Sequence, residues 1–241
     1  MQKLRVLDLF SGIGGFSLGL ERTGGFETVA FCEIEEFPRK VLRKHWPEVP
    51  IYEDIRDLTA DALARDGIDV DVIAGGFPCQ DISVAGKGAG LGGKQSSLWS
   101  EYARLIGEVR PRFVLVENVA ALLARGMGEV LGDLAASGYD AVWDCIPASF
   151  VGAPHNRDRL WIVAHPERDQ QSRKKPCVWP LGRVGRFEQP VSWDRSWQDA
   201  LSAFRGVDDG LSRSVDRTDG LRNSVVPQIP EMIGRAILAA E

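Results

Sequence analysis

The first twenty residues constrain the fold more strongly than any other stretch of the chain. An apolar run at Leu4–Phe10 has the character of a buried strand, and the glycine-rich Ser11–Gly15 follows it and opens a helix that extends to Leu20. A strand, a glycine turn and a helix in this order form the nucleotide-binding start of a doubly wound α/β fold. The dinucleotide fingerprint G-x-G-x-x-G is incomplete, because Ser17 occupies the place of its last glycine. The turn therefore indicates a ligand other than NAD.

The same alternation of short apolar runs and helical segments continues along the chain. Parallel strands that are buried on both faces read as continuous apolar runs, whereas the last two runs, which contain Trp143 and Trp161, have the spacing of an antiparallel pair. We predict an α/β fold with a doubly wound, mostly parallel sheet, an antiparallel edge and a small irregular second subdomain. The strands are expected at residues 4–10, 28–32, 51–52, 70–74, 112–116, 141–146 and 160–164.

Four of these strands end beside side chains that can bind or react, and ligands of open α/β sheets collect at the carboxyl ends of the strands. Glu33 is placed to accept hydrogen bonds from ribose hydroxyls, although a solvated acid gives the same pattern. Asp54 could accept a hydrogen bond from an exocyclic amine such as that of adenine. Cys79, within the stretch Gly75–Ser83, is either a nucleophile or a small buried residue in a corner. Glu117 is either the cap of the next helix or a proton donor facing Cys79.

Two arginines stand between the last two predicted strands. Arg157 and Arg159 occupy positions i and i+2 of an extended segment, so their side chains should point the same way. They suit binding a phosphate, or orienting a ring carbonyl and a carboxylate, and an ordinary charged hairpin is the alternative. The glycine-rich Gly86–Lys94 is interpreted as a mobile lid over the same edge, with a plain surface loop as its alternative.

The composition changes after the last predicted strand. Basic residues alternate with tryptophan and phenylalanine in residues 165–212, a pattern that suits a nucleic-acid surface and equally a small irregular subdomain with a tryptophan core. An apolar helix from about Ile229 to Leu238 follows. We therefore expect residues 1–164 to form the main domain, residues 165–212 a reduced second unit, and residues 213–241 a segment that returns to the main domain.

Composition excludes some classes of protein. No apolar run approaches the ~18 residues of a membrane helix, and the first residues lack the pattern of a signal peptide. The four cysteines, Cys32, Cys79, Cys145 and Cys177, are far apart and form no C-x-x-C, which argues against a zinc site or a disulfide framework and suits a reducing cytoplasm. The net charge of −5 counts against a nucleic-acid partner, but the distribution of charge matters more than its total.

Taken in order, six motifs resemble those of the bacterial and phage DNA (cytosine-5)-methyltransferases. Any one of them is common, whereas six in this order are highly specific. The resemblance covers residues 4–164 and about 213–238. The motifs are DLFSGIGGFSLGL at Asp8–Leu20, the acids Glu33 and Asp54, GFPCQ at Gly76–Gln80, ENV at Glu117–Val119, RDR at Arg157–Arg159 and NSVVP at Asn223–Pro227.

The resemblance implies a Rossmann-like, S-adenosylmethionine-dependent enzyme that methylates C5 of cytosine in duplex DNA, as a monomer and without a metal. Cys79 would attack C6 of a flipped base, Glu117 would act at N3, and Arg157 and Arg159 would position the base. DNA contacts are implied at Gln80, Ser83, Lys87, Arg173, Lys174 and Lys175. S-adenosyl-L-methionine, which leaves as S-adenosyl-L-homocysteine, would contact Phe10, Ser11, Gly12, Ile13, Gly14, Gly15, Glu33, Ile34, Asp54, Ile55, Phe77, Pro78, Leu98, Asn223, Ser224 and Val225.

Three features depart from the family pattern. His155 replaces the usual glutamine before the arginines, and Arg222 replaces the glycine before Asn223. The segment that reads the target sequence in this family is short here, which predicts a short site, weak specificity or help from elsewhere. Two alternatives stay open: the transfer-RNA-methylating branch of the same family, and a catalytically silent DNA-binding relative.

Overall fold

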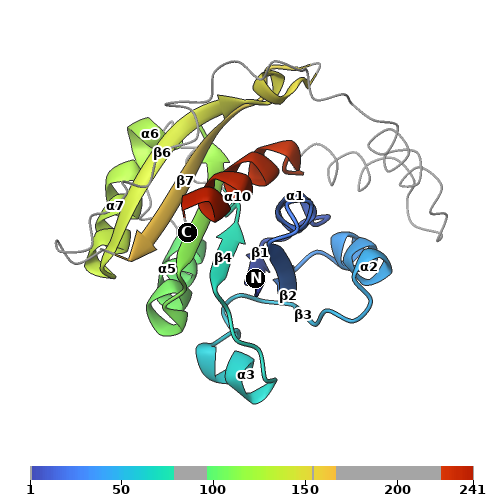
Figure 1. Ribbon diagram of the computed structural model, residues 1–241. Helices are drawn as coiled ribbons and strands as arrows, with labels where there is room; N and C mark the ends of the chain where they lie inside the picture. The colour runs from blue at the N-terminus through green and yellow to red at the C-terminus, as the bar shows by residue number, and fades with distance from the viewer. Residues whose placement is uncertain (1, 79–96, 154, 167–223, 241) are drawn as a thin grey trace.

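The computed structural model describes residues 2–78, 97–153, 155–166 and 224–240, and within them the chain builds one seven-stranded sheet (Figure 1). The strand order is β3-β2-β1-β4-β5-β7-β6. β7 runs antiparallel to both β5 and β6, and the remaining pairs are parallel. The predicted doubly wound sheet with an antiparallel edge is thereby confirmed. The strands are β1 Leu4–Leu9, β2 Phe26–Cys32, β3 Ile51–Tyr52, β4 Val72–Gly75, β5 Phe113–Val119, β6 Tyr139–Pro147 and β7 Asp158–Pro166.

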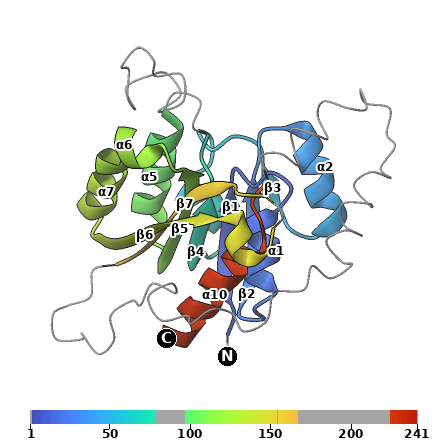
Figure 2. The same cartoon turned by 90° about the horizontal axis from the view of Figure 1, so that it is seen from above.

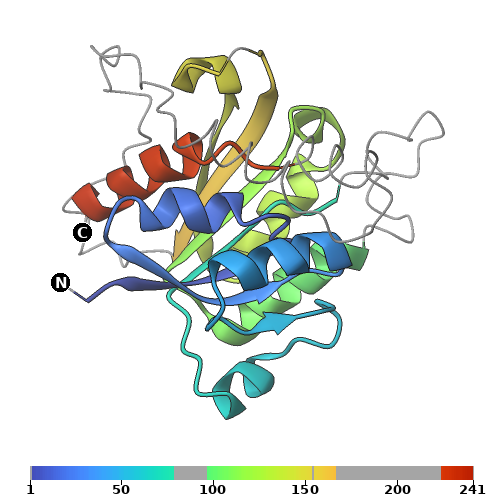
Figure 3. The same ribbon diagram turned by 90° about the vertical axis from the view of Figure 1, so that its right-hand side faces the viewer.

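Helices cover both faces of the sheet (Figures 1 and 2). α1 and α10 pack together on one face, where Figure 3 shows them side by side, and α5 and α7 pack on the other. None of the described helices is long and apolar enough to cross a membrane. The helices are α1 Gly15–Glu21, α2 Glu36–His45, α3 Ala60–Arg65, α5 Ser97–Val109, α6 Leu122–Arg125, α7 Met127–Ala136 and α10 Gln228–Ala240, with a 3₁₀ helix, η2, at Ala148–Val151.

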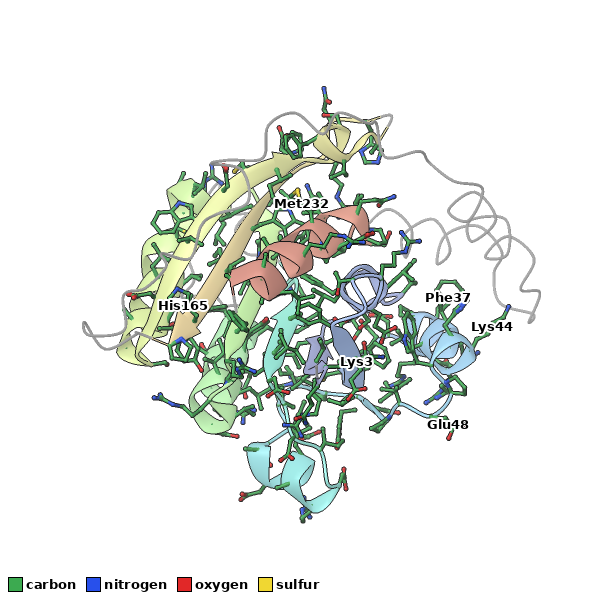
Figure 4. The ribbon with its side chains drawn as sticks, viewed as in Figure 1. Lys3, Phe37, Lys44, Glu48, His165 and Met232 are labelled. Carbon is green, nitrogen blue, oxygen red and sulfur yellow. The ribbon has the colours of Figure 1, made fainter. Side chains whose placement is uncertain are left out.

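Each central strand contributes to two apolar cores, because successive side chains of a strand point to opposite faces. In β1, Leu7 packs into the core beneath α5 and α7, whereas Val6 packs into the core beneath α1 and α10. Met232, labelled on α10 in Figure 4, belongs to the second core. Burial on both faces explains why these strands read as unbroken apolar runs in the sequence.

β5 is longer than the sequence pattern predicts. The apolar run ends at Val116, but the strand continues through Glu117 and Asn118 to Val119, because antiparallel β7 extends the ladder and pairs Glu117 with Trp161. Glu117 therefore lies inside a strand and does not follow one. Its backbone is held by the sheet, which fixes the position from which its side chain projects.

Candidate active site

The carboxyl ends of β1, β2, β4 and β5 meet at one edge of the sheet. The register places Gly75 of β4 opposite both Leu9 of β1 and Val116 of β5, and Leu9 opposite Cys32 of β2. The residues that follow these positions are the predicted ones: the glycine turn, Glu33, the GFPCQ stretch and Glu117. The fold thus brings together four motifs that are far apart in the sequence.

The glycine turn after β1 depends on backbone conformations that favour glycine. Gly12 and Gly14 have φ values of 52° and 86°, in the left-handed region. A Cβ on Gly14 would also lie 2.7 Å from the ring of Trp46, whose Nε1 donates a hydrogen bond to Glu21 of α1 at 3.0 Å. Trp46 was not among the predicted site residues. It packs from the end of α2 against both ends of α1, through its ring at Gly14 before the helix and through its hydrogen bond to Glu21, the last helical residue.

Glu33 is held against this turn by backbone amides. Its Oε2 accepts a hydrogen bond from Gly12 N at 2.7 Å, and its Oε1 accepts one from Glu35 N at 2.8 Å. Burial raises the pKa of Glu33, and these two hydrogen bonds oppose the rise. Each carboxylate oxygen has a second lone pair, so the side chain can still accept the ribose hydroxyls that the sequence predicts. The neighbouring Ile34 is 58% exposed and presents an apolar surface beside Glu33.

The remaining residues predicted to contact a cofactor differ in their exposure. Asp54 pairs with Arg56: Nη2 of Arg56 lies 2.6 Å from Oδ2 of Asp54. This hydrogen bond lowers the pKa of the Asp54 carboxyl. Ile55 and Phe77 are buried in the core, so their side chains face the protein interior. Pro78 is exposed and Leu98 is half-buried. The Asp54 carboxylate is therefore already paired with a charged partner, Arg56, at this edge.

Asp8 is a buried acid that the sequence pattern does not single out, because it lies within the apolar run of β1. Asp8 is fully buried, and its Oδ2 accepts hydrogen bonds from the hydroxyl of Ser17 at 2.7 Å and from Ser17 N at 3.2 Å. This pair explains why Ser17 replaces the last glycine of the dinucleotide fingerprint: its hydroxyl ties α1 to β1. Burial is the main reason why the pKa of Asp8 rises to about 8. The sequence signal for this buried pair is an acid inside an otherwise apolar strand, nine residues before a serine.

We expect Asp8 to make stability depend on pH. Its folded-state pKa of about 8 lies above the ordinary value of 3.8, so the folded state binds this proton more tightly than the unfolded state does. The resulting stabilisation is fully present below about pH 4 and is lost as the pH rises toward about 8, by at most about 1.4 kcal/mol per pH unit. Urea unfolding of wild type and Asp8→Asn at about pH 5 and about pH 8 measures this loss. Between these two pH values, the free energy of unfolding of wild type should fall relative to that of Asp8→Asn. The same wild-type-to-variant difference at both pH values would contradict the raised pKa of Asp8.

Glu117 forms a charged cluster with the two predicted arginines. Its Oε1 lies 3.0 Å from Arg159 Nε and 4.0 Å from Arg157 Nη2. The carboxyl is buried, which raises its pKa, while the positive charges of Arg159 and Arg157 oppose the rise. The two arginines do point to the same side, as their i and i+2 spacing predicted. We call Glu117, Arg157 and Arg159 the glutamate cluster.

The backbone that leads to Cys79 packs directly against this cluster. A Cβ on Gly76 would lie 2.8 Å from Glu117 Oε2, and Asn118 Nδ2 donates a hydrogen bond to Phe77 O at 3.1 Å. The end of β4 is therefore fixed to β5 by both a close approach and a hydrogen bond. This contact places Gly76 and Phe77, the first two residues of the GFPCQ stretch, beside the Glu117 carboxyl.

We expect Gly76→Ala to impair the site without unfolding the protein. The new methyl group would displace the Glu117 carboxyl from Arg159, and a shift of this size costs about 10–100-fold in turnover. The matched control is Gly107→Ala in α5, where a Cβ meets open space, and which should add about 0.5–1 kcal/mol of stability. Rates of the methyl transfer that the family resemblance implies, together with thermal unfolding of both variants, test this. Full activity of Gly76→Ala would show that the carboxyl position is unimportant.

The described part of the C-terminal segment reaches the same edge. Ser224 O accepts a hydrogen bond from Arg157 Nη1 at 2.8 Å. A Cβ on Gly15 would lie 2.7 Å from Val225 O, so the segment also lies against the first residue of α1. Residues 224–227 therefore connect the glutamate cluster with the glycine turn.

Several predictions fall outside the described residues. They concern Cys79, the predicted lid at residues 86–94, Arg222, the unit at residues 165–212, and the residues Gln80, Ser83, Lys87, Arg173, Lys174, Lys175 and Asn223. Their proposed roles stay predictions. Among the described residues, no group of histidine, cysteine and acidic side chains is arranged to hold a metal ion.

Comparisons with known proteins give the family. A family model described as C-5 cytosine-specific DNA methylase matches residues 4–193. The Type II methyltransferase M.HgiBI of Herpetosiphon aurantiacus is 35% identical over 167 residues, which are 68% of this chain and 37% of that protein. M.Eco47II of Escherichia coli is 38% identical over 164 residues, 66% of this chain and 39% of that protein. The chain thus spans less than half the length of these relatives.

Solved structures agree with the fold. A structure described as a DNA modification methyltransferase encoded within an E. coli prophage is 27% identical, with a TM-score of 0.58 over 68% of this chain and 47% of that one. A Spodoptera frugiperda DNMT2 variant, 22% identical, shares the fold with a TM-score of 0.59 over 72% of this chain and 53% of that one. Because the family match extends over most of the chain and includes the edge where the four motifs meet, this protein belongs to the C-5 cytosine-specific DNA methylases.

Proposed function

We propose that this protein transfers a methyl group from S-adenosyl-L-methionine to C5 of cytosine in duplex DNA. The observation that carries the proposal is the glutamate cluster: a buried carboxyl with an arginine at 3.0 Å, at the strand edge that also holds the glycine turn and Glu33. A carboxyl that can hold a proton, next to donors for a ring carbonyl, suits a cytosine ring and has no evident use in a protein that only contacts the DNA backbone.

The residues at the glycine turn fit the proposed cofactor. The left-handed glycines bring the backbone close to a ligand, Glu33 keeps acceptor capacity for ribose hydroxyls, and the exposed Ile34 offers an apolar surface for a purine ring. Residues 224–225 lie over the start of α1, at the other side of the turn. When bound, S-adenosyl-L-methionine supplies an electrophilic methyl group on its sulfonium sulfur.

The protein residues would activate a carbon that does not accept a methyl group unaided. The Cys79 thiolate adds to C6 of cytosine, and the electron pair of the C5–C6 bond becomes available at C5. Glu117 donates a proton or a hydrogen bond to N3, which stabilises the adduct, and Arg159 donates to O2. After C5 has taken the methyl group, a base removes the C5 proton and the returning electron pair expels the Cys79 thiolate. A proton that was passed to N3 returns to Glu117 in the same step.

The environment of Glu117 suits its role at N3. Burial raises its pKa, so the carboxyl holds a proton more readily than an exposed glutamate does. Arg159 at 3.0 Å limits that rise and keeps the conjugate base stable once the proton has moved. These atoms cannot reach a base stacked in a duplex, so the target cytosine must turn out of the helix, as it does for other enzymes that modify bases.

Methyl transfer from labelled S-adenosyl-L-methionine to duplex DNA and, in parallel, to transfer RNA tests the proposal. We expect label in DNA cytosine and none in the RNA. Label in RNA alone would assign the chain to the RNA-methylating alternative. The absence of label in both would favour a silent DNA-binding relative, provided that the protein is folded by circular dichroism.

A further inference from the structure

Arg157 and Arg159 contact the same carboxyl, but they differ in their second contact. Arg159 Nε lies 3.0 Å from Glu117 Oε1, and Arg159 Nη1 donates to the adjacent carbonyl of Asp158 at 2.8 Å. Arg157 Nη2 lies farther from the same oxygen, at 4.0 Å, and its Nη1 donates to Ser224 O at 2.8 Å. Ser224 is 67 residues away in sequence, so this hydrogen bond joins two distant parts of the chain.

The segment that Arg157 holds lies against the cofactor side of the site. The carbonyl of Val225 approaches Gly15 so closely that a Cβ there would lie 2.7 Å from it, and Pro227 O is in similar close approach to Gly19. Gly15 is the first residue of α1 and follows the turn whose Gly12 amide binds Glu33. Residues 224–227 therefore pack on one side against the face of α1 that carries Gly15 and Gly19. On the other side they accept the hydrogen bond from the Arg157 guanidinium.

From these contacts we propose that Arg157 is a positioning residue for the cofactor, although its side chain lies in the glutamate cluster. It anchors residues 224–227 over the glycine turn and so couples the seating of the cofactor to the formation of the base-binding site. This inference rests on the proposed function for the identity of the cofactor. It separates the two arginines: Arg159 acts on Glu117 and the base, and Arg157 acts mainly through the C-terminal segment.

The physical basis is the strength of the hydrogen bond that Arg157 makes. A charged donor on a half-buried carbonyl is among the stronger hydrogen bonds of a protein, and its loss leaves the carbonyl without this partner. Arg157 is also half-buried, and burial together with the nearby Arg159 lowers its pKa. The difference between the two arginines lies in their contacts: Arg157 donates to Ser224 O, whereas Arg159 lies against Glu117.

The test measures binding of S-adenosyl-L-homocysteine to the full chain by calorimetry, without DNA. Arg157→Met keeps the apolar part of the side chain and removes its donors, and Arg159→Met is the matched control two residues away. We expect Arg157→Met to weaken binding by about tenfold, about 1.4 kcal/mol, and Arg159→Met to leave it unchanged within about twofold. Arg157→Lys, which keeps a charged donor at this position, should restore binding to within about threefold of wild type.

Steady-state kinetics give a second readout that a loss of stability alone would not produce. We expect Arg157→Met to raise KM for S-adenosyl-L-methionine and Arg159→Met to lower kcat. Equal binding by wild type and Arg157→Met, or equal weakening by both methionine variants, would overturn the inference. If wild type and the variants bind S-adenosyl-L-homocysteine as expected but wild type methylates no DNA, the proposed function would be contradicted and the role of Arg157 would still be supported. Thermal unfolding confirms that each variant is folded, and if Arg157→Met is not, Arg157→Gln, which also removes the charged donor, carries the test by the same tenfold criterion.

Discussion

Replacing Cys79 by alanine should reduce methyl transfer to DNA by about 10⁴-fold or more, because the Cys79 thiolate is the group that we propose supplies the electron pair that adds to C6. Binding of S-adenosyl-L-homocysteine should persist, since the glycine turn and Glu33 are not altered. The measurement is incorporation of labelled methyl groups into duplex DNA at saturating cofactor. Activity of Cys79→Ala close to that of wild type would refute the covalent mechanism.

The two described cysteines provide the controls. Cys32 is buried at the end of β2, and burial together with Glu33 and Asp54 raises its pKa to about 12. Burial and the nearby acids Asp144 and Asp158 also raise the pKa of Cys145. Both thiols are therefore protonated at neutral pH and are poor nucleophiles. Cys145→Ala should keep full methyl-transfer activity, and this separates the loss of one particular thiol from the loss of any thiol.

Glu117→Gln should lower turnover by about 10²–10⁴-fold while leaving binding of S-adenosyl-L-homocysteine close to wild type. An amide of the same shape cannot pass a proton to N3, and it removes the negative charge that faces Arg159 at 3.0 Å. Single-turnover rates on duplex DNA measure the effect. Glu129→Gln in the first turn of α7 is the control, because Glu129 is an exposed glutamate and should tolerate the change. A loss confined to DNA binding, with an unchanged single-turnover rate, would contradict the role of Glu117 at N3.

The sequence predicts the sheet and the edge where the site lies because both follow from local rules. Apolar runs buried on two faces mark the strands, and the residues that follow them identify the carboxyl edge. The i and i+2 spacing of Arg157 and Arg159 predicts their common direction, and the distances to Glu117 confirm it. The length of β5 could not be predicted, because the ladder beyond Val116 depends on pairing with β7.

What local rules miss are contacts between segments that are far apart in sequence. The hydrogen bond from Arg157 to Ser224 and the packing of Trp46 on Gly14 depend on how helices and loops meet after folding. Asp8 was missed for a different reason: a strand pattern tolerates one buried acid only if a donor such as Ser17 is in place, and the donor lies on the next helix. Tertiary structure thus decides which polar residues are structural and which can meet a ligand.

The most direct test of the account uses a DNA duplex that carries 5-fluorocytosine at the target position. Fluorine at C5 cannot leave as the proton does, so the enzyme should remain attached to the base after methyl transfer. We predict a covalent protein–DNA complex that forms only with S-adenosyl-L-methionine present and that maps by peptide mass spectrometry to Cys79. A folded, cofactor-binding protein that forms no such complex with DNA it has been shown to methylate, or a complex attached to another residue, would contradict the account.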